Sequence, residues 1–204
     1  MSLEAKNLTF RYPRRGRGAV LEGVTLTLTP GERLGLTAPS GRGKTTLCKL
    51  LAGYERPARG EILLDGRPLS QYRGACPVQL IWQHPETVLD PLLPLEASLL
   101  EAGPVEERLL RALHIQPQWL RRYPQELSGG ELQRFCIARA LGPATRYLLC
   151  DEITAMLDLI TQAQIWSFLL EEARRRELGL LIVSHSAPLL ERVCSRRVEL
   201  PPLR

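Results

Sequence analysis

The chain of 204 residues has no stretch that approaches about 18 consecutive apolar residues, so no membrane-spanning helix is expected. Its first residues, Met1 to Glu4, lack the basic-then-apolar form of a secretory signal peptide. The cysteines are scattered without a C-x-x-C pair, which is typical of reduced thiols in a cytosolic protein. They are Cys48, Cys76, Cys136, Cys150 and Cys194. No internal repeat or low-complexity segment is present, so we expect one globular domain.

A nucleic-acid partner is not expected, although the formal net charge is +5. No basic stripe is interleaved with aromatic residues, as nucleic-acid-binding surfaces require. The densest basic cluster lies among glycines and prolines, and is interpreted as a solvated loop or a loop that steers a nucleotide. It consists of Arg11, Arg14, Arg15 and Arg17. A second run, Arg174 to Arg176, ends a predicted helix, where cations interact favourably with the helix dipole.

Residues 37–46 have the pattern of a phosphate-binding loop. An apolar run ending at Leu36 precedes them and a helical pattern follows, which is the strand–turn–helix context that G-x-x-x-x-G-K-[ST] requires. Lys44 is expected to bridge the β- and γ-phosphates, and the Thr45 hydroxyl to ligate Mg²⁺. Ala38 replaces the first glycine, which is tolerable only if its φ stays negative. The expected nucleotide-binding residues here are Ser40, Gly41, Arg42, Gly43, Lys44, Thr45 and Thr46.

Two adjacent carboxylates follow the apolar run Tyr147 to Cys150. Such a run indicates a buried parallel strand, and open α/β sheets bind ligands at the carboxyl ends of their strands. Asp151 is therefore expected to hold Mg²⁺, and Glu152 to polarise the attacking water. The alternative is that the two acids only cap the next helix.

The segment Leu127 to Arg134 reads Leu-Ser-Gly-Gly-Glu-Leu-Gln-Arg. Gly129 and Gly130 are expected to form a turn whose backbone N–H groups can approach a phosphate. A helix is predicted from Glu131 to Leu141, with its N-terminus directed at an anion. Ser128, Gly129, Gly130 and Glu131 are therefore further candidates for nucleotide binding.

Alternating strand and helix patterns predict an α/β fold with a mostly parallel sheet. Residues 84–126 lack strand character and are expected to be helical. The expected strands are 2–10, 20–37 with a turn at Pro30-Gly31, 61–66, 78–82, 146–150, 180–184 and 196–200. The expected helices are 43–53, 95–102, 105–114, 159–178 and 187–194.

Taken together, these motifs resemble the ATP-binding cassette (ABC) ATPases, over nearly all of the chain. The resemblance implies a RecA-like P-loop NTPase fold with an antiparallel β subdomain and an inserted α-helical subdomain. It implies one nucleotide-binding domain over 1–204, with the catalytic core in 1–83 and 135–204. Residues 84–134 would form the helical subdomain that carries the family's signature motif, which is Leu127-Ser128-Gly129-Gly130 in this chain.

The resemblance also assigns roles to single residues. Tyr12 matches the aromatic residue that stacks on adenine, and Gln83 the glutamine that senses Mg²⁺ and the γ-phosphate. Asp158 matches an aspartate that contacts the opposing subunit, and His185 a histidine that touches the γ-phosphate. The resemblance thus implies catalytic roles for Glu152, His185 and Gln83. It implies that Mg²⁺ is bound by Thr45, Gln83 and Asp151. The departures from the common pattern are Ile153, Ala155 and Ser186.

A narrower resemblance concerns the transported solute. The segments 123–130 and 83–85, with Leu89-Asp90-Pro91, look like the oligopeptide, dipeptide and nickel importer branch. This implies ATP and Mg²⁺ as cofactors and a second ABC ATPase subunit, identical or paralogous. It also implies membrane permease subunits docked near 84–100, an extracytoplasmic solute-binding protein acting indirectly, and a place on the cytoplasmic face of the membrane. Two alternatives stay open: a soluble cassette ATPase of DNA repair or iron–sulphur assembly, and a non-hydrolysing clamp.

Overall fold

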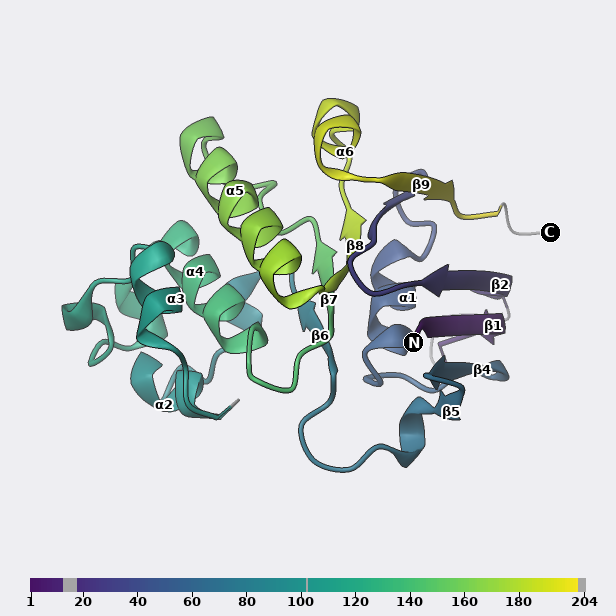
Figure 1. Cartoon of the computed structure of the whole chain (residues 1–204), viewed down its shortest axis with the longest axis horizontal. Helices are drawn as coiled ribbons and strands as arrows, with labels where there is room; N and C mark the ends of the chain where they lie inside the picture. The colour runs from purple at the N-terminus through teal and green to yellow at the C-terminus, as the bar shows by residue number, and fades with distance from the viewer. Residues whose placement is uncertain (13–17, 102, 202–204) are drawn as a thin grey trace.

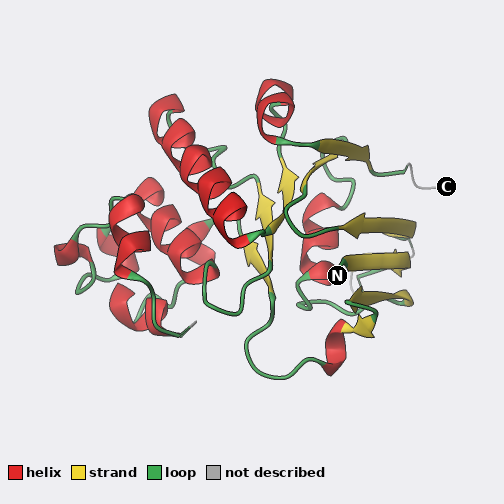
Figure 2. Cartoon of the chain, viewed as in Figure 1, coloured by secondary structure: helices red, strands yellow, loops and turns green. Residues whose placement is uncertain are grey.

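The computed structural model describes residues 1–12, 18–101 and 103–201 (Figure 1). Arg14, Arg15 and Arg17 of the basic cluster therefore lie outside the described residues. The described chain forms two β-sheets with helices around them, as Figure 2 shows. No helix of the described part is long and apolar enough to cross a membrane.

The first sheet is antiparallel and has the strand order β2-β1-β4-β5. Its strands are β1 (Leu3–Phe10), β2 (Leu21–Leu28), β4 (Arg59–Leu64) and β5 (Arg67–Pro68). The apolar residues of β1 alternate with polar ones, so one face is buried. The pairing of β1 with β4 is interrupted between Lys6 and Thr9, where Gly60 has φ 84° and packs against the backbone of β1 too closely for a Cβ.

The second sheet is entirely parallel and has the order β6-β7-β8-β3-β9. Its strands are β3 (Arg33–Thr37), β6 (Val78–Ile81), β7 (Tyr147–Asp151), β8 (Gly179–Val183) and β9 (Arg196–Glu199). Every residue of β7 and β8 is buried, which explains their continuous apolar sequence. Since all strands point the same way, their carboxyl ends share one edge of the sheet.

Helices cover both sides of the parallel sheet. Helix α1 (Lys44–Leu51) belongs to the hydrophobic core shared with the antiparallel sheet. A second core joins the other face to the remaining helices (Figure 1). These are α2 (Leu95–Leu100), α3 (Glu107–Ala112), α4 (Gly129–Ala140), α5 (Leu159–Arg176) and α6 (Ala187–Val193). Short 3₁₀ helices lie at Leu69–Gln71, Pro85–Thr87, Pro117–Trp119 and Pro124–Glu126.

The fold class expected from the sequence is confirmed, with two local differences. The expected strand region 20–37 is divided between the two sheets, because the turn at Thr29 to Glu32 separates β2 from β3. Helix α4 begins at Gly129 rather than Glu131, so the two glycines form its first turn. The expected boundary between residues 134 and 135 falls within this helix.

Candidate active site

The loop between β3 and α1 has the backbone that a phosphate-binding turn needs. Gly41 and Gly43 have φ values of 75° and 84°, in the left-handed region that favours glycine. A Cβ at Gly43 would lie 2.8 Å from Leu21 Cδ2, so this position is closed to larger residues. Ala38 is not among the described non-glycine residues with positive φ, so its methyl group strains nothing.

Lys44 lies beneath this loop and is only 5% exposed. Its Nζ donates to the carbonyl oxygens of Ala38 at 2.8 Å and Pro39 at 3.2 Å. The ammonium group is therefore held against the loop backbone rather than extended into water. A fixed cation beside a glycine-rich turn suits the binding of a polyphosphate.

Asp151 ends β7 next to the start of α1, and is 3% exposed. Burial raises the pKa of its carboxyl, although a hydrogen bond from the Thr45 side chain opposes the shift. A hydroxyl and one carboxylate are the small set of oxygen ligands that a nucleotide-bound Mg²⁺ takes from a protein. No group of three or more His, Cys, Asp or Glu side chains that could hold a metal is found among the described residues. The Thr45 hydroxyl and the Asp151 carboxylate, as oxygen donors, fit a metal that phosphate oxygens also ligate.

Glu152 and His185 face each other across the ends of β7 and β8. His185 Nε2 lies 3.0 Å from Glu152 Oε1. The backbone of Glu152 has φ 51°, an uncommon value for a residue with a side chain, and its N–H donates to Val183 O at 3.1 Å. A carboxylate and an imidazole are thereby aimed at the same edge of the sheet as the phosphate-binding loop.

Ser128 caps helix α4 together with Glu131. The Glu131 N–H donates to Ser128 Oγ at 3.4 Å, and Glu131 Oε2 accepts from Ser128 N and Oγ at 2.7 Å each. This is a capping box, which satisfies two helix-end donors. The hydrogen bond from the Ser128 backbone lowers the pKa of Glu131. A Cβ at Gly129 would meet no atom within 4 Å, so the backbone there is open to a ligand.

The signature residues open onto a groove of about 630 Å³. Gln83 and Asp158 line the same groove as Ser128 to Glu131, whereas no residue of the loop 38–46 does. Asp158 caps α5 by accepting from the N–H groups of Ile160 and Thr161, both at 3.0 Å. The candidate residues therefore divide into two sets, one around Lys44 and one around Ser128. Gln83, expected to hold the metal with Thr45 and Asp151, lines the groove of the second set.

Tyr12 belongs to the first set. Its hydroxyl lies 3.3 Å from Thr46 Oγ1, and its ring packs edge-on against Phe10 with centroids 4.8 Å apart. This places an aromatic ring beside the start of α1.

Sequence reasoning missed Gln133, which is 2% exposed. Its Nε2 donates to Trp82 O at 3.4 Å, and it lines the groove with Gln83. Its position three residues after Gly130, one helical turn along α4, was the available signal.

Comparisons with known proteins show the family to which the chain belongs. A family model described as "ABC transporter" matches residues 21–155. The nickel import ATP-binding protein NikE of Rhodospirillum rubrum is 38% identical, over 98% of this chain and 77% of that protein. The glutathione import ATP-binding protein GsiA of Pectobacterium atrosepticum is 35% identical over 95% of this chain, which spans only 35% of that protein.

Solved structures share the fold. The ATP-binding subunit of an ABC transporter superposes with a TM-score of 0.85 at 28% identity, covering 98% of this chain and 86% of that one. The bacterial ABC transporter cassette MJ0796, solved as a dimer, gives 0.83 at 24% identity, covering 97% and 94%. The residues matched by the family model include Lys44, Gln83, Ser128 and Glu152, which belong to the candidate site described above. The chain therefore belongs to the ABC transporter family, in which it is an ATP-hydrolysing subunit.

Proposed function

We propose that this chain drives an importer of peptides or of nickel and other metal chelates, from the cytoplasmic face of the membrane. One observation supports ATP hydrolysis most directly: Lys44, Asp151 and the Glu152–His185 pair lie at the same edge of the parallel sheet. The proposed solute rests on the nickel and glutathione importers that are 35–38% identical.

In the proposed reaction, the loop residues Ser40 to Thr46 bind the phosphates of ATP and Tyr12 stacks on the adenine. Lys44 supplies positive charge to the β- and γ-phosphates. Thr45, Asp151 and Gln83 would hold Mg²⁺, which supplies further positive charge to the phosphates when bound. Glu152 polarises the water that attacks the γ-phosphate and accepts its proton. His185, which contacts Glu152, holds that carboxylate in place and contacts the phosphate.

The second half of the site would come from another cassette. The groove with Ser128, Gly129, Gly130 and Asp158 contains no residue of the phosphate-binding loop, which supports two chains that meet head to tail. Each chain would then present its signature helix to the nucleotide of the other. A γ-phosphate held between them favours the closed pair, and hydrolysis opens it.

Membrane permease subunits are the proposed partners that use this motion, with an extracytoplasmic solute-binding protein acting through them. The exposed leucines of the segment 84–100 support a docking surface there: Leu92, Leu93 and Leu100. Residues 84–134 would be the helical subdomain of a single cassette domain.

Two experiments test the proposal. Purified protein should hydrolyse ATP only when Mg²⁺ is present, and Lys44→Ala should abolish both turnover and ATP-dependent dimers. A strain without this chain should lose uptake of radiolabelled nickel or of a labelled oligopeptide, and regain it with the wild-type chain but not with Lys44→Ala. Unchanged uptake of both solutes would contradict the proposed substrate class while leaving the ATPase activity intact.

A further inference from the structure

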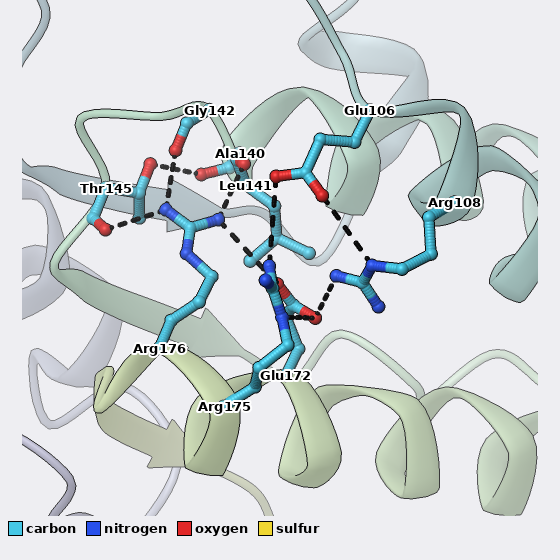
Figure 3. Close-up of polar contacts among 9 residues, drawn as sticks. All are labelled: Glu106, Arg108, Ala140, Leu141, Gly142, Thr145, Glu172, Arg175 and Arg176. Atoms are coloured by element: carbon cyan, nitrogen blue, oxygen red, sulfur yellow. Dashed lines mark hydrogen bonds and ion pairs between the residues drawn. The ribbon is translucent and has the colours of Figure 1, made fainter.

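A buried carboxylate lies where three helices meet (Figure 3). Glu172 of α5 is 1% exposed. Arg108 of α3 donates to its Oε2 at 2.6 Å, and Arg175 of α5 to its Oε1 at 2.6 Å. Arg176 Nη1 stands 4.0 Å away. The buried carboxylate of Glu172 thus faces three arginines. Arg108 comes from α3, whereas Arg175 and Arg176 belong to α5, as Glu172 itself does.

Arg176 extends the cluster to the end of α4. Its guanidinium donates to Leu141 O at 2.9 Å, Gly142 O at 2.8 Å and Thr145 O at 3.0 Å. All three carbonyls belong to the chain that leaves α4 and leads into β7 (Figure 3). The carboxyl ends of α4 and α5 are therefore tied to each other and, through Arg108, to α3.

The opposite ends of the same two helices carry residues of the proposed second half-site. Ser128 caps the start of α4 and Asp158 the start of α5, and both line the groove. The two helices lie side by side and run in the same direction (Figure 1), with Arg134 Nη2 3.4 Å from Gln164 Oε1 along their length. The Glu172 cluster and the groove residues Ser128 and Asp158 thus lie at opposite ends of the same pair of helices.

A buried ion cluster is by itself weak evidence of a stabilising role. The other buried residues of α5 are mostly apolar, and a well-packed apolar side chain commonly matches or exceeds a buried ion pair in stability. The cluster does fix the orientation of α3 relative to α5, because the planar guanidinium of Arg108 binds the carboxylate of Glu172 in a defined geometry. Burial favours the neutral form of Glu172, but the hydrogen bonds from Arg175 and Arg108 outweigh it and lower the pKa, so the group stays ionised at neutral pH.

We propose that Glu172 is a positioning residue for ATP hydrolysis. Through Arg108 and Arg176 it fixes the spacing of α3, α4 and α5, and so sets Ser128 and Asp158 in the geometry that the second cassette requires. The inference rests on the proposed two-cassette site. It requires that loss of the contact between Arg108 and Glu172 disturbs the nucleotide site formed between the two cassettes. Nucleotide binding at the chain's own phosphate-binding loop should be unchanged.

The test compares Arg108→Gln with Arg111→Gln. Both remove one positive charge from α3, but the one ion pair of Arg111 among the described residues is with exposed Glu107, at 3.6 Å. Three quantities are measured at a temperature where melting curves show each variant folded: affinity for a fluorescent ATP analogue, turnover of ATP, and ATP-dependent dimerisation in a Glu152→Gln background. For Arg108→Gln we expect unchanged nucleotide affinity, weaker dimerisation and a turnover about 10–100-fold lower, since a misplacement of about 1 Å can cost on the order of 10²-fold. Arg111→Gln should match the parent in all three.

A second variant, Arg108→Lys, covers the case in which Arg108→Gln does not fold. The ammonium keeps a charge opposite Glu172 but lacks the planar fork, so turnover should still fall while the melting temperature stays near that of the parent. Normal turnover and dimerisation in a folded Arg108 variant would overturn the proposal, and so would equal losses in the Arg108 and Arg111 variants. Failure of the two-cassette function would look different, because the parent protein would then neither dimerise nor depend on Ser128.

Discussion

His185 Nε2 lies 3.0 Å from Glu152 Oε1, at the ends of two neighbouring parallel strands. The contact joins the carboxylate expected to polarise water with the imidazole expected to touch the γ-phosphate. Glu152 holds its place with a left-handed backbone, at φ 51°, so its direction is set by the chain itself as well as by His185. A rigid carboxylate at this edge suits a general base.

The first prediction concerns this base. Glu152→Gln should bind ATP as the wild type does but hydrolyse it about 10²–10⁴-fold more slowly, the usual scale for a lost general base. Because the γ-phosphate persists, ATP should also hold the variant as a dimer, which sedimentation velocity can detect. The amide can still bond His185, so the fold should be unchanged. Turnover at the wild-type rate would remove Glu152 from the mechanism.

The second prediction concerns the adenine. Tyr12→Ala should weaken ATP binding by about 1–2 kcal/mol, whereas Tyr12→Trp should not, since any flat ring can stack on a base. Tyr12→Phe is the matched control, because it removes only the hydroxyl that lies 3.3 Å from Thr46 Oγ1. Titration calorimetry with a non-hydrolysable ATP analogue gives the affinities. Equal affinity in the alanine variant would move the stacking role to another residue.

The third prediction concerns stability and pH. Burial raises the pKa of Asp151 above its ordinary value of 3.8, so the charged form costs stability in the folded protein at neutral pH. Asp151→Asn should therefore raise the melting temperature of nucleotide-free protein at pH 7 by a few degrees, while it abolishes hydrolysis. The gain should shrink as the pH falls through the raised pKa of Asp151 and disappear below 3.8, where Asp151 is protonated in both the folded and the unfolded state.

Asp65 provides a control of opposite sign. A hydrogen bond from Arg146, at 2.7 Å, lowers the pKa of Asp65 despite partial burial. Its charge thus contributes stability that is present above pH 3.8 and is lost as the pH falls. Asp65→Asn should lower the melting temperature at pH 7. If scanning calorimetry finds Asp151→Asn as destabilised as Asp65→Asn, burial does not govern the charge at Asp151.

The sequence predicted most of the fold and the local motifs, because each motif is a continuous segment. The phosphate-binding loop and the run into Asp151 need only neighbouring residues to be recognised. The predicted start of helix α4 is two residues late because glycine is a poor helix former. Ser128 and Glu131 nevertheless have the spacing of a capping box, which indicates the observed start.

Contacts between distant segments could not be predicted in this way. Arg174 to Arg176 were interpreted as cations that complement a helix dipole. All three do lie in the last turn of α5, but Arg175 and Arg176 also contact Glu172, whose partner Arg108 is 64 residues away in the sequence. Helical spacing places Glu172 on the buried face of α5, three residues after Leu169 and seven after Ile165, but no local pattern indicates that Arg108 is its partner.

The last prediction concerns the proposed docking surface for the permease. The segment Leu89 to Leu100 is rich in leucine, and sequence alone cannot separate core from surface there. Leu89, Leu95 and Leu99 are buried, whereas Leu92 is 82% exposed. Leu92→Asp should therefore fold normally and retain ATP affinity, but uncouple solute uptake from hydrolysis. Leu95→Asp is the contrasting control, because a carboxylate in the core should cost several kcal/mol and unfold the domain.

Thermal melting, ATP titration and uptake in cells separate these outcomes. A melting temperature within error of the wild type would show that Leu92→Asp leaves the core intact, so a loss of uptake would then be due to the surface. Replacing Leu92 should cost little stability, since an exposed side chain has little burial free energy to lose. Leu92 lies in the same segment as exposed Leu93 and Leu100, and exposed apolar side chains that form a patch are typical of an interaction site, for which a permease is the partner proposed here. A folded Leu92→Asp protein that still supports uptake at the normal rate would refute this docking surface.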